Sequence, residues 1–142
     1  MIYTEMTKKA MKLAYAVHDG QFDKGGVPYI FHPIAVAEAM QTEDETVVAL
    51  LHDTIEDCGI TKEYLMAAGF SREVADAVYA MSKRDGETYD EYIARVKANP
   101  IAKKVKISDL NHNMDLSRLS TVTDQAKMRI EKYKKALEMM NE

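Results

Sequence analysis

The feature that most limits the folds open to this chain is a cluster of ionisable residues directly behind an apolar run. The run is Val47–Leu51, and the letters HDTIED follow it at once. An unpaired charge buried beside such a run costs on the order of several kcal/mol, so the fold has to supply partners for these groups. If the helix continues, His52 shares a face with Glu56. Asp53 shares a face with Asp57 in the same way. We therefore expect a metal-ligating end with two carboxylates one turn further on.

A simpler interpretation of the same stretch is a helix C-terminus that frays into a polar loop, helped by Gly59. That interpretation would suffice for an isolated His-Asp pair. The spacing HDxxED behind an apolar helix favours the metal site instead, because four ionisable groups at this density are poor core material.

The remainder of the chain predicts an all-α bundle. Apolar residues recur at helical spacing, and Thr, Ser or Pro stand where helices would begin. We expect helices over residues 5–17, 32–40, 43–55, 61–68, 71–81, 89–98, 100–116 and 124–140. There is no alternating strand pattern, internal repeat or interdomain linker. We expect one domain over residues 1–142, with the metal site between helices.

Composition argues against several classes of protein. The net charge of −4 and the lack of a long basic block argue against a nucleic-acid partner. No apolar stretch reaches the length of a membrane span, and the N-terminus lacks the apolar segment of a signal peptide. The single cysteine, Cys58, excludes an internal disulfide and fits a reducing compartment. We expect a cytoplasmic protein with neither a nucleic-acid nor a membrane partner.

A metal bound by His52 and Asp53 needs further ligands from elsewhere in the chain. His32 lies at a loop-to-helix junction that the following proline makes rigid. Asp109 follows an apolar helical stretch, and Asn113 stands one turn later on the same face. We predict that His32 and Asp109 complete the ligand set.

His18 and His112 compete with these ligands, although a lone histidine near a helix end is more often a hydrogen-bonded structural residue. Two histidines and two aspartates with open positions suit Mn²⁺, Fe²⁺, Co²⁺ or Zn²⁺ better than Mg²⁺. We therefore expect a divalent metal cofactor rather than a closed structural zinc site.

The chemistry expected of such a site is the activation of water for attack on an electrophile such as phosphorus. Glu56 or Asp57 would hold that water or shuttle its proton. A phosphate substrate also needs nearby cations, and the candidates are Lys24 in a glycine-rich loop and Lys106 close to Asp109.

Four segments taken together resemble a known family. They are Gly20-Gln21, Gly26–Pro33, Ala49–Asp57 and Lys106–Met114. This order of motifs resembles the HD-domain hydrolases, most closely the hydrolase half of the RelA/SpoT alarmone enzymes and the small stand-alone SpoT homologues. The likeness spans roughly residues 8–114, and the combination of GxPYxxHP with HDTxED is specific.

The resemblance implies an HD-domain helical bundle that removes the 3′-pyrophosphate from ppGpp or pppGpp, usually with manganese, by a metal-activated water. It implies a metal site formed by His32, His52, Asp53 and Asp109. It also implies that Glu56 and Asp57 act as the acid/base pair that orients the water.

The resemblance further implies that Lys24, Tyr29 and Asn113 face the nucleotide, where Lys106 is our additional candidate. Two departures concern the substrate, because Asp23 and Leu110 stand where the family usually has arginine. A carboxylate offers no cationic plane for stacking on a base. We expect Asp23 either to accept hydrogen bonds from an exocyclic amine or to point to solvent.

The alternatives follow from these departures. The same site could act on another nucleotide, such as ppApp, the 2′-phosphate of NADPH or a nucleoside phosphate. A different class of function is a nucleotide-binding HD module without turnover, which would need neither of the two acid/base carboxylates. In each case the partner is a small nucleotide, and the protein is a monomer or a homodimer.

Overall fold

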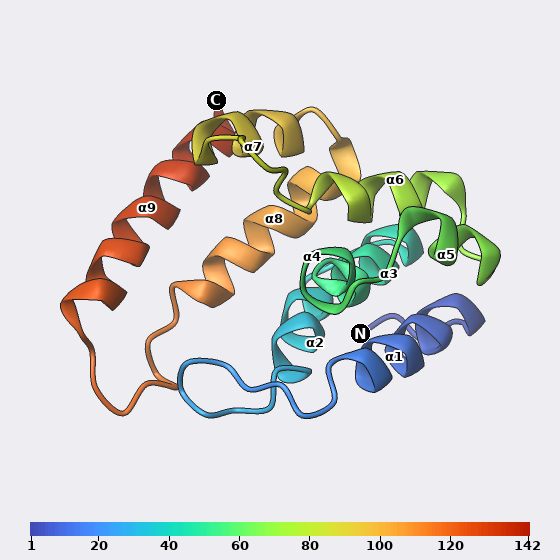
Figure 1. Cartoon of the computed structure of the whole chain (residues 1–142), viewed down its shortest axis with the longest axis horizontal. Helices are drawn as coiled ribbons and strands as arrows, with labels where there is room; N and C mark the ends of the chain where they lie inside the picture. The colour runs from blue at the N-terminus through green and yellow to red at the C-terminus, as the bar shows by residue number, and fades with distance from the viewer.

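The computed structural model describes all residues from 1 to 142 and consists of helices joined by loops, the longest of which are residues 18–30 and 114–123 (Figure 1). The helices are α1 (Glu5–Val17), α2 (Phe31–Glu38), α3 (Glu43–Leu51), α4 (Thr54–Cys58), α5 (Lys62–Ala67), α6 (Arg72–Ala80), α7 (Tyr89–Lys97), α8 (Pro100–Asn113) and α9 (Asp124–Asn141). The prediction of an all-α fold is confirmed, since the only strand-like pairing is an isolated bridge between Phe22 and Pro28. None of the helices combines the length and apolarity needed to span a bilayer.

Side-chain caps explain why most helices begin where the sequence indicates. A polar side chain just before the helix accepts a hydrogen bond from a backbone N–H of the first turn, which stabilises the helix by about 1 kcal/mol. The capping residues are Thr4, Thr42, Thr61, Ser71, Thr88, Asn99 and Thr123.

Helix α3 is the centre of the fold. It packs against α1, α2, α6 and α8, and its residues from Glu45 to Leu51 are all buried (Figure 1). A helix that is covered on every side needs a nearly continuous apolar sequence, and the run 47–51 provides it. The C-terminal end of this helix therefore delivers the residues that follow it into the interior of the bundle.

The structure corrects the predicted continuous helix over residues 43–55, because α3 ends at Leu51 and α4 starts at Thr54. Side chains take over the hydrogen bonds of the last turn. Nδ1 of His52 lies 2.6 Å from the carbonyl oxygen of Ala49, and Oγ1 of Thr54 donates to the carbonyl of Leu51 at 2.8 Å. His52 and Asp53 thus occupy a two-residue break, and the expected face-sharing with Glu56 and Asp57 does not hold.

Helix α8 also ends earlier than predicted, at Asn113, and residues 114–123 connect it to α9. This connection lies against the glycine-rich loop before α2, as Figure 1 shows at the foot of the molecule. A Cβ atom added at Gly25 would stand 2.2 Å from the carbonyl oxygen of Arg118, so only glycine permits this contact. The two loops form one wall beside the predicted site.

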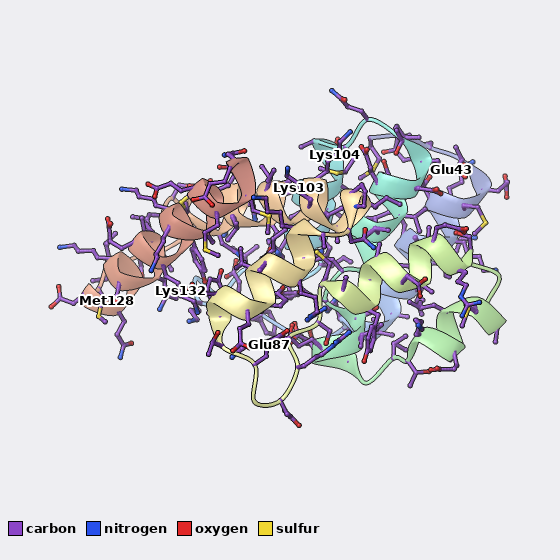
Figure 2. All side chains as sticks on the ribbon, turned by 90° about the horizontal axis from the view of Figure 1, so that it is seen from above. Glu43, Glu87, Lys103, Lys104, Met128 and Lys132 are labelled. Carbon is purple, nitrogen blue, oxygen red and sulfur yellow. The ribbon has the colours of Figure 1, made fainter.

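Helix α9 packs on α7 and α8 through its C-terminal half, where Ala136 and Met140 are buried. In its N-terminal half Ala126 is also buried, whereas the labelled Met128 lies at the edge of the molecule in Figure 2 and is 72% exposed.

Candidate metal centre

Four predicted ligands converge between α2, the break after α3 and α8. His32 comes from the first turn of α2, His52 and Asp53 from the break, and Asp109 from α8. His32, His52 and Asp109 are buried, and each offers a ligand atom within 4.8 Å of the other two. Residues far apart in the sequence thus meet in one interior cluster.

The distances between the ligand atoms show that Asp53 belongs to the same cluster. Nε2 of His52 lies 3.1 Å from Oδ2 of Asp53 and 3.4 Å from Oδ1 of Asp109. Nε2 of His32 lies 2.8 Å from Oδ1 of Asp109 and 3.8 Å from Oδ2 of Asp53. Two imidazole nitrogens and two carboxylate oxygens therefore face a common point.

The orientation of His52 fits a bound cation. Because its Nδ1–H donates to the carbonyl oxygen of Ala49, Nε2 of the neutral ring carries a lone pair and points into the cluster. This nitrogen is buried and has no hydrogen-bond partner of suitable geometry, although two carboxylates lie close to it. Buried polar atoms are normally satisfied, and a divalent ion would satisfy this nitrogen together with the carboxylates.

Opposite charges within the cluster outweigh the effect of burial. Burial opposes a charge on His52, yet Asp53 and Asp109 raise the pKa of this imidazole well above its usual value. Burial also opposes the charge of Asp109, but Lys106 and the histidines hold its pKa well below the usual range. The pKa of Asp53 falls to about 2 despite burial, chiefly because of His52. A metal ion would therefore compete with protons for these ligands.

Three side chains hold the carboxylate ligands in place. The Tyr29 hydroxyl donates to Oδ2 of Asp53 at 2.5 Å, and the Asn113 amide donates to Oδ1 of Asp109 at 3.1 Å. The ammonium group of Lys106 donates to Oδ2 of Asp109 at 2.9 Å. Lys106 was expected to contact phosphates, but it is buried and directed at the ligand. Hydrogen bonds of this kind orient metal ligands.

Glu56 and Asp57 lie on α4, outside the buried cluster, and both are exposed. Although both residues are exposed, the surrounding protein partly desolvates their carboxyl groups. This desolvation, together with the carboxylates of Asp57 and Asp53, raises the pKa of Glu56. Partial desolvation and Asp53 likewise raise the pKa of Asp57. A raised pKa favours the protonated form of a carboxyl group and makes it a candidate for exchanging a proton with water or a substrate.

A cleft of about 340 Å³ opens beside the cluster and is within the usual size range of ligand sites. Its lining includes Lys24, Tyr29 and Asn113, three of the four residues predicted to contact a nucleotide. Tyr29 and Asn113 also hydrogen-bond to the ligands, so they connect the cleft with the cluster. Arg118 and Arg129 line the cleft as well. Neither arginine could be identified from sequence patterns, because both lie outside the recognisable motifs.

Asp23 does not point freely to solvent, because both of its carboxylate oxygens bind groups of the protein. Oδ1 of Asp23 accepts hydrogen bonds from the backbone N–H groups of Gly25 and Val27, at 2.8 and 2.9 Å. Its Oδ2 accepts a hydrogen bond from Nε of Arg118 at 3.1 Å. The carboxylate is satisfied within the protein and stabilises the glycine-rich loop.

The two competing histidines lie outside the metal-ligand group. His18 has its Nδ1 2.8 Å from Oε1 of Gln21. His112 has its Nδ1 2.7 Å from Nδ1 of His32 and supports this predicted ligand from behind. His112 is thus a neighbour of the centre that the sequence alone did not distinguish from a ligand.

Comparisons with known proteins identify the family of this chain. A family model described as HD domain matches residues 10–140. The guanosine-3′,5′-bis(diphosphate) 3′-pyrophosphohydrolase of Vibrio cholerae is 46% identical over 90 residues, which cover 58% of this chain and 13% of that protein. The bifunctional (p)ppGpp synthase/hydrolase SpoT of Escherichia coli is 34% identical over 125 residues, covering 75% of this chain and 18% of that protein. The chain thus spans less than a fifth of the length of these curated relatives.

A solved structure with a similar fold belongs to a metazoan ortholog of SpoT, described as hydrolysing ppGpp. The two structures align with a TM-score of 0.76 and 20% sequence identity, over 99% of this chain and 87% of the other. At this level of identity the likeness shows a shared fold.

Proposed function

We propose that this chain, which belongs to the HD-domain family, is a metal-dependent phosphohydrolase that removes the 3′-pyrophosphate from guanosine alarmones such as ppGpp and pppGpp. The observation that carries the proposal is the buried group His32, His52 and Asp109, which adjoins a cleft lined with cationic side chains. The Vibrio cholerae relative is a 3′-pyrophosphohydrolase by name and the Escherichia coli relative a (p)ppGpp synthase/hydrolase, which supports this choice of reaction.

We assign the metal to four ligands, His32, His52, Asp53 and Asp109. Mixed imidazole and carboxylate donors are compatible with Mn²⁺, Fe²⁺, Co²⁺ and Zn²⁺. We propose Mn²⁺ because the resembled family usually uses manganese. When bound, such an ion supplies a polarised water and neutralises charge on a phosphate group. The hydrogen bonds of Tyr29 and the other supporting side chains keep the carboxylates aimed at this point.

Glu56 and Asp57 are our candidates for the acid/base pair. In the proposed reaction, water attacks the phosphorus atom that is bonded to the ribose 3′-oxygen, and the bond between these two atoms breaks. The proton of the water passes to one carboxylate, and the departing 3′-oxygen takes up a proton. Pyrophosphate leaves with the oxygen of the water. The raised pKa values of both groups support this role.

Lys24, Tyr29 and Asn113 are the proposed nucleotide contacts, since all three line the cleft. The exposed ammonium group of Lys24 supplies positive charge for phosphates. Lys106 is no longer assigned to the substrate, because its ammonium group is committed to Asp109. The single cysteine, Cys58, supports the cytoplasm as the place of action.

A second candidate is the same chemistry on another nucleotide, such as ppApp, the 2′-phosphate of NADPH or a nucleoside phosphate. The observation in its favour is that Asp23 and Leu110 replace arginines usual in the resembled family, and that Asp23 hydrogen-bonds to its own loop and to Arg118. The metal cluster is unaffected by these differences.

The test is the release of phosphate and pyrophosphate by manganese-loaded protein from a panel of ppGpp, ppApp, NADPH and simple nucleotides. Pyrophosphate from ppGpp is the expected result. Turnover of another nucleotide of the panel, without turnover of ppGpp, would change the assigned substrate and leave the proposed chemistry in place. No turnover across the panel with the metal bound would overturn the enzymatic function and favour a binding module.

A further inference from the structure

The guanidinium group of Arg118 is held at all three of its nitrogen atoms. Nε donates to Oδ2 of Asp23 at 3.1 Å, and Nη1 donates to Nε2 of His112 at 2.8 Å. Nη2 makes a longer contact of 3.5 Å with the carbonyl oxygen of His112. The side chain lines the cleft and is 25% exposed. It is therefore fixed in place while part of its surface stays open.

The groups that hold Arg118 are themselves rigid. Asp23 is fixed by two backbone N–H groups of its own loop, and Gly25 of that loop packs on the carbonyl oxygen of Arg118. His112 belongs to α8 and contacts His32 through its other ring nitrogen. Both the backbone and the side chain of Arg118 are thus tied to neighbouring elements. Such a group loses little further freedom when a ligand binds.

An arginine can meet a ligand with the edge or with the face of its planar guanidinium group. Bidentate binding of a phosphate uses N–H groups along one edge. In Arg118 every nitrogen already contacts an acceptor of the protein. The side chain therefore has fewer N–H groups left for bidentate binding of a phosphate. The faces of the plane carry no such contacts and suit stacking on an aromatic ring or a base.

We propose that Arg118 is the stacking plane for the purine base of the nucleotide. This inference rests on the proposed nucleotide substrate. The glycine-rich loop itself carries a carboxylate, Asp23. The cationic plane beside it is the guanidinium group of Arg118, which comes from the connection after α8. Because every base offers a π face, recognition through Arg118 accepts guanine and adenine alike.

The first experiment compares Arg118→Gln with Arg118→Lys, which retains the charge but lacks the plane. Loss of base stacking is expected to raise KM for ppGpp about tenfold or more in both variants, with kcat within about threefold of wild type. Arg72→Gln, which removes an exposed arginine at the start of α6, is the control and should behave like wild type. A KM for Arg118→Lys equal to that of wild type would overturn the inference.

A second variant separates stacking from a purely structural role. Arg118→Trp restores a plane without the hydrogen bonds and introduces the sole tryptophan of the chain. We expect it to recover most of the lost affinity. Its fluorescence should be quenched by guanine and adenine nucleotides to a similar extent, and not by pyrophosphate or ribose 5-phosphate. Quenching by pyrophosphate alone, or no response to either nucleotide, would contradict the inference.

These readouts also separate this inference from the proposed function. Quenching by purine nucleotides, in a protein whose wild type hydrolyses no member of the panel, would retain the base contact and overturn the hydrolase. Hydrolysis of ppGpp with an unchanged KM in Arg118→Gln would retain the hydrolase and overturn the base contact.

Discussion

The metal cluster and the rim of the neighbouring cleft, which Asp23, Gly25 and Arg118 form, are built in opposite ways. The cluster is buried, and its ligands have one another as neighbours, with Lys106 compensating the charge of Asp109. The rim is partly exposed and depends on a contact between Asp23 and Arg118, which lie 95 residues apart in the sequence. A change in the cluster disturbs several buried charges at once, whereas the hydrogen bonds of Asp23 at the rim all go to groups outside the ligand set. We infer that the cluster sets the reaction and the rim sets the substrate.

The largest effect is expected from His52→Ala in the cluster. Without this imidazole, Asp53 and Asp109 lose a partner that holds their charges together, so the metal-free protein becomes less stable. We expect the loss of bound metal, a lower melting temperature and a fall in turnover of more than about a hundredfold. Elemental analysis and thermal unfolding measure both properties. Full metal occupancy in this variant would remove His52 from the ligand set.

A smaller effect, confined to turnover, is expected from Glu56→Gln. This side chain lies outside the buried cluster, so the metal content and the melting temperature should match those of wild type. Removal of a proton-exchanging group lowers kcat by about a hundredfold. The comparison of kcat at equal metal content checks this, and unchanged turnover would reject the catalytic role of Glu56.

The pH dependence of metal binding tests the electrostatics of the cluster. The raised pKa of His52 means that the metal-free cluster retains this proton above the ordinary histidine value of 6.5. Metal binding must displace the proton, so the affinity should fall by about tenfold per pH unit below the raised pKa. Calorimetry in two buffers of different ionisation enthalpy measures the released protons. Affinity independent of pH would contradict the assignment.

The same shifts predict the stability of the metal-free protein. The raised pKa of His52 contributes stability that is fully present below pH 6.5 and is lost as the pH rises through the raised value. The lowered pKa values of Asp53 and Asp109 contribute stability above pH 3.8 that is lost at lower pH. The melting temperature of the metal-free protein should therefore be highest between pH 3.8 and pH 6.5. A steady increase up to pH 9 would contradict this prediction.

The smallest effect is expected at the rim, from Asp23→Asn. The amide oxygen can still accept hydrogen bonds from Gly25 and Val27, but the charge opposite Arg118 is lost. The ion pair is partly exposed and contributes about 1 kcal/mol or less, so we expect KM to rise by no more than about fivefold. The metal content and kcat should not change. A loss of metal here would show that the rim and the cluster are not separate.

The sequence predicted the helices and the cluster because both depend on local patterns. Helix-capping residues such as Thr4 and Thr42 act within one turn, and the ligands stand in compact motifs. The break at His52 was missed, because a side chain that bonds to a backbone carbonyl competes with helix propagation only in this particular geometry.

The rim could not be predicted from local patterns. The partner of Asp23 lies in a connection without a motif, and the contact exists only because Gly25 lets the two loops meet. The same limit applies to Lys106, which the sequence alone suggests as a phosphate contact although its ammonium group binds Asp109. Its position near Asp109 is evident from the sequence, but the direction of its ammonium group depends on packing in the interior.

The most direct test of the central claim is a titration of metal-free wild-type protein with Mn²⁺ while pyrophosphate release from ppGpp is followed. The account predicts no release without metal, a rise in proportion to the metal added and saturation at one ion per chain. Equal hydrolysis by the metal-free protein, or no hydrolysis with one ion bound per chain, would contradict it.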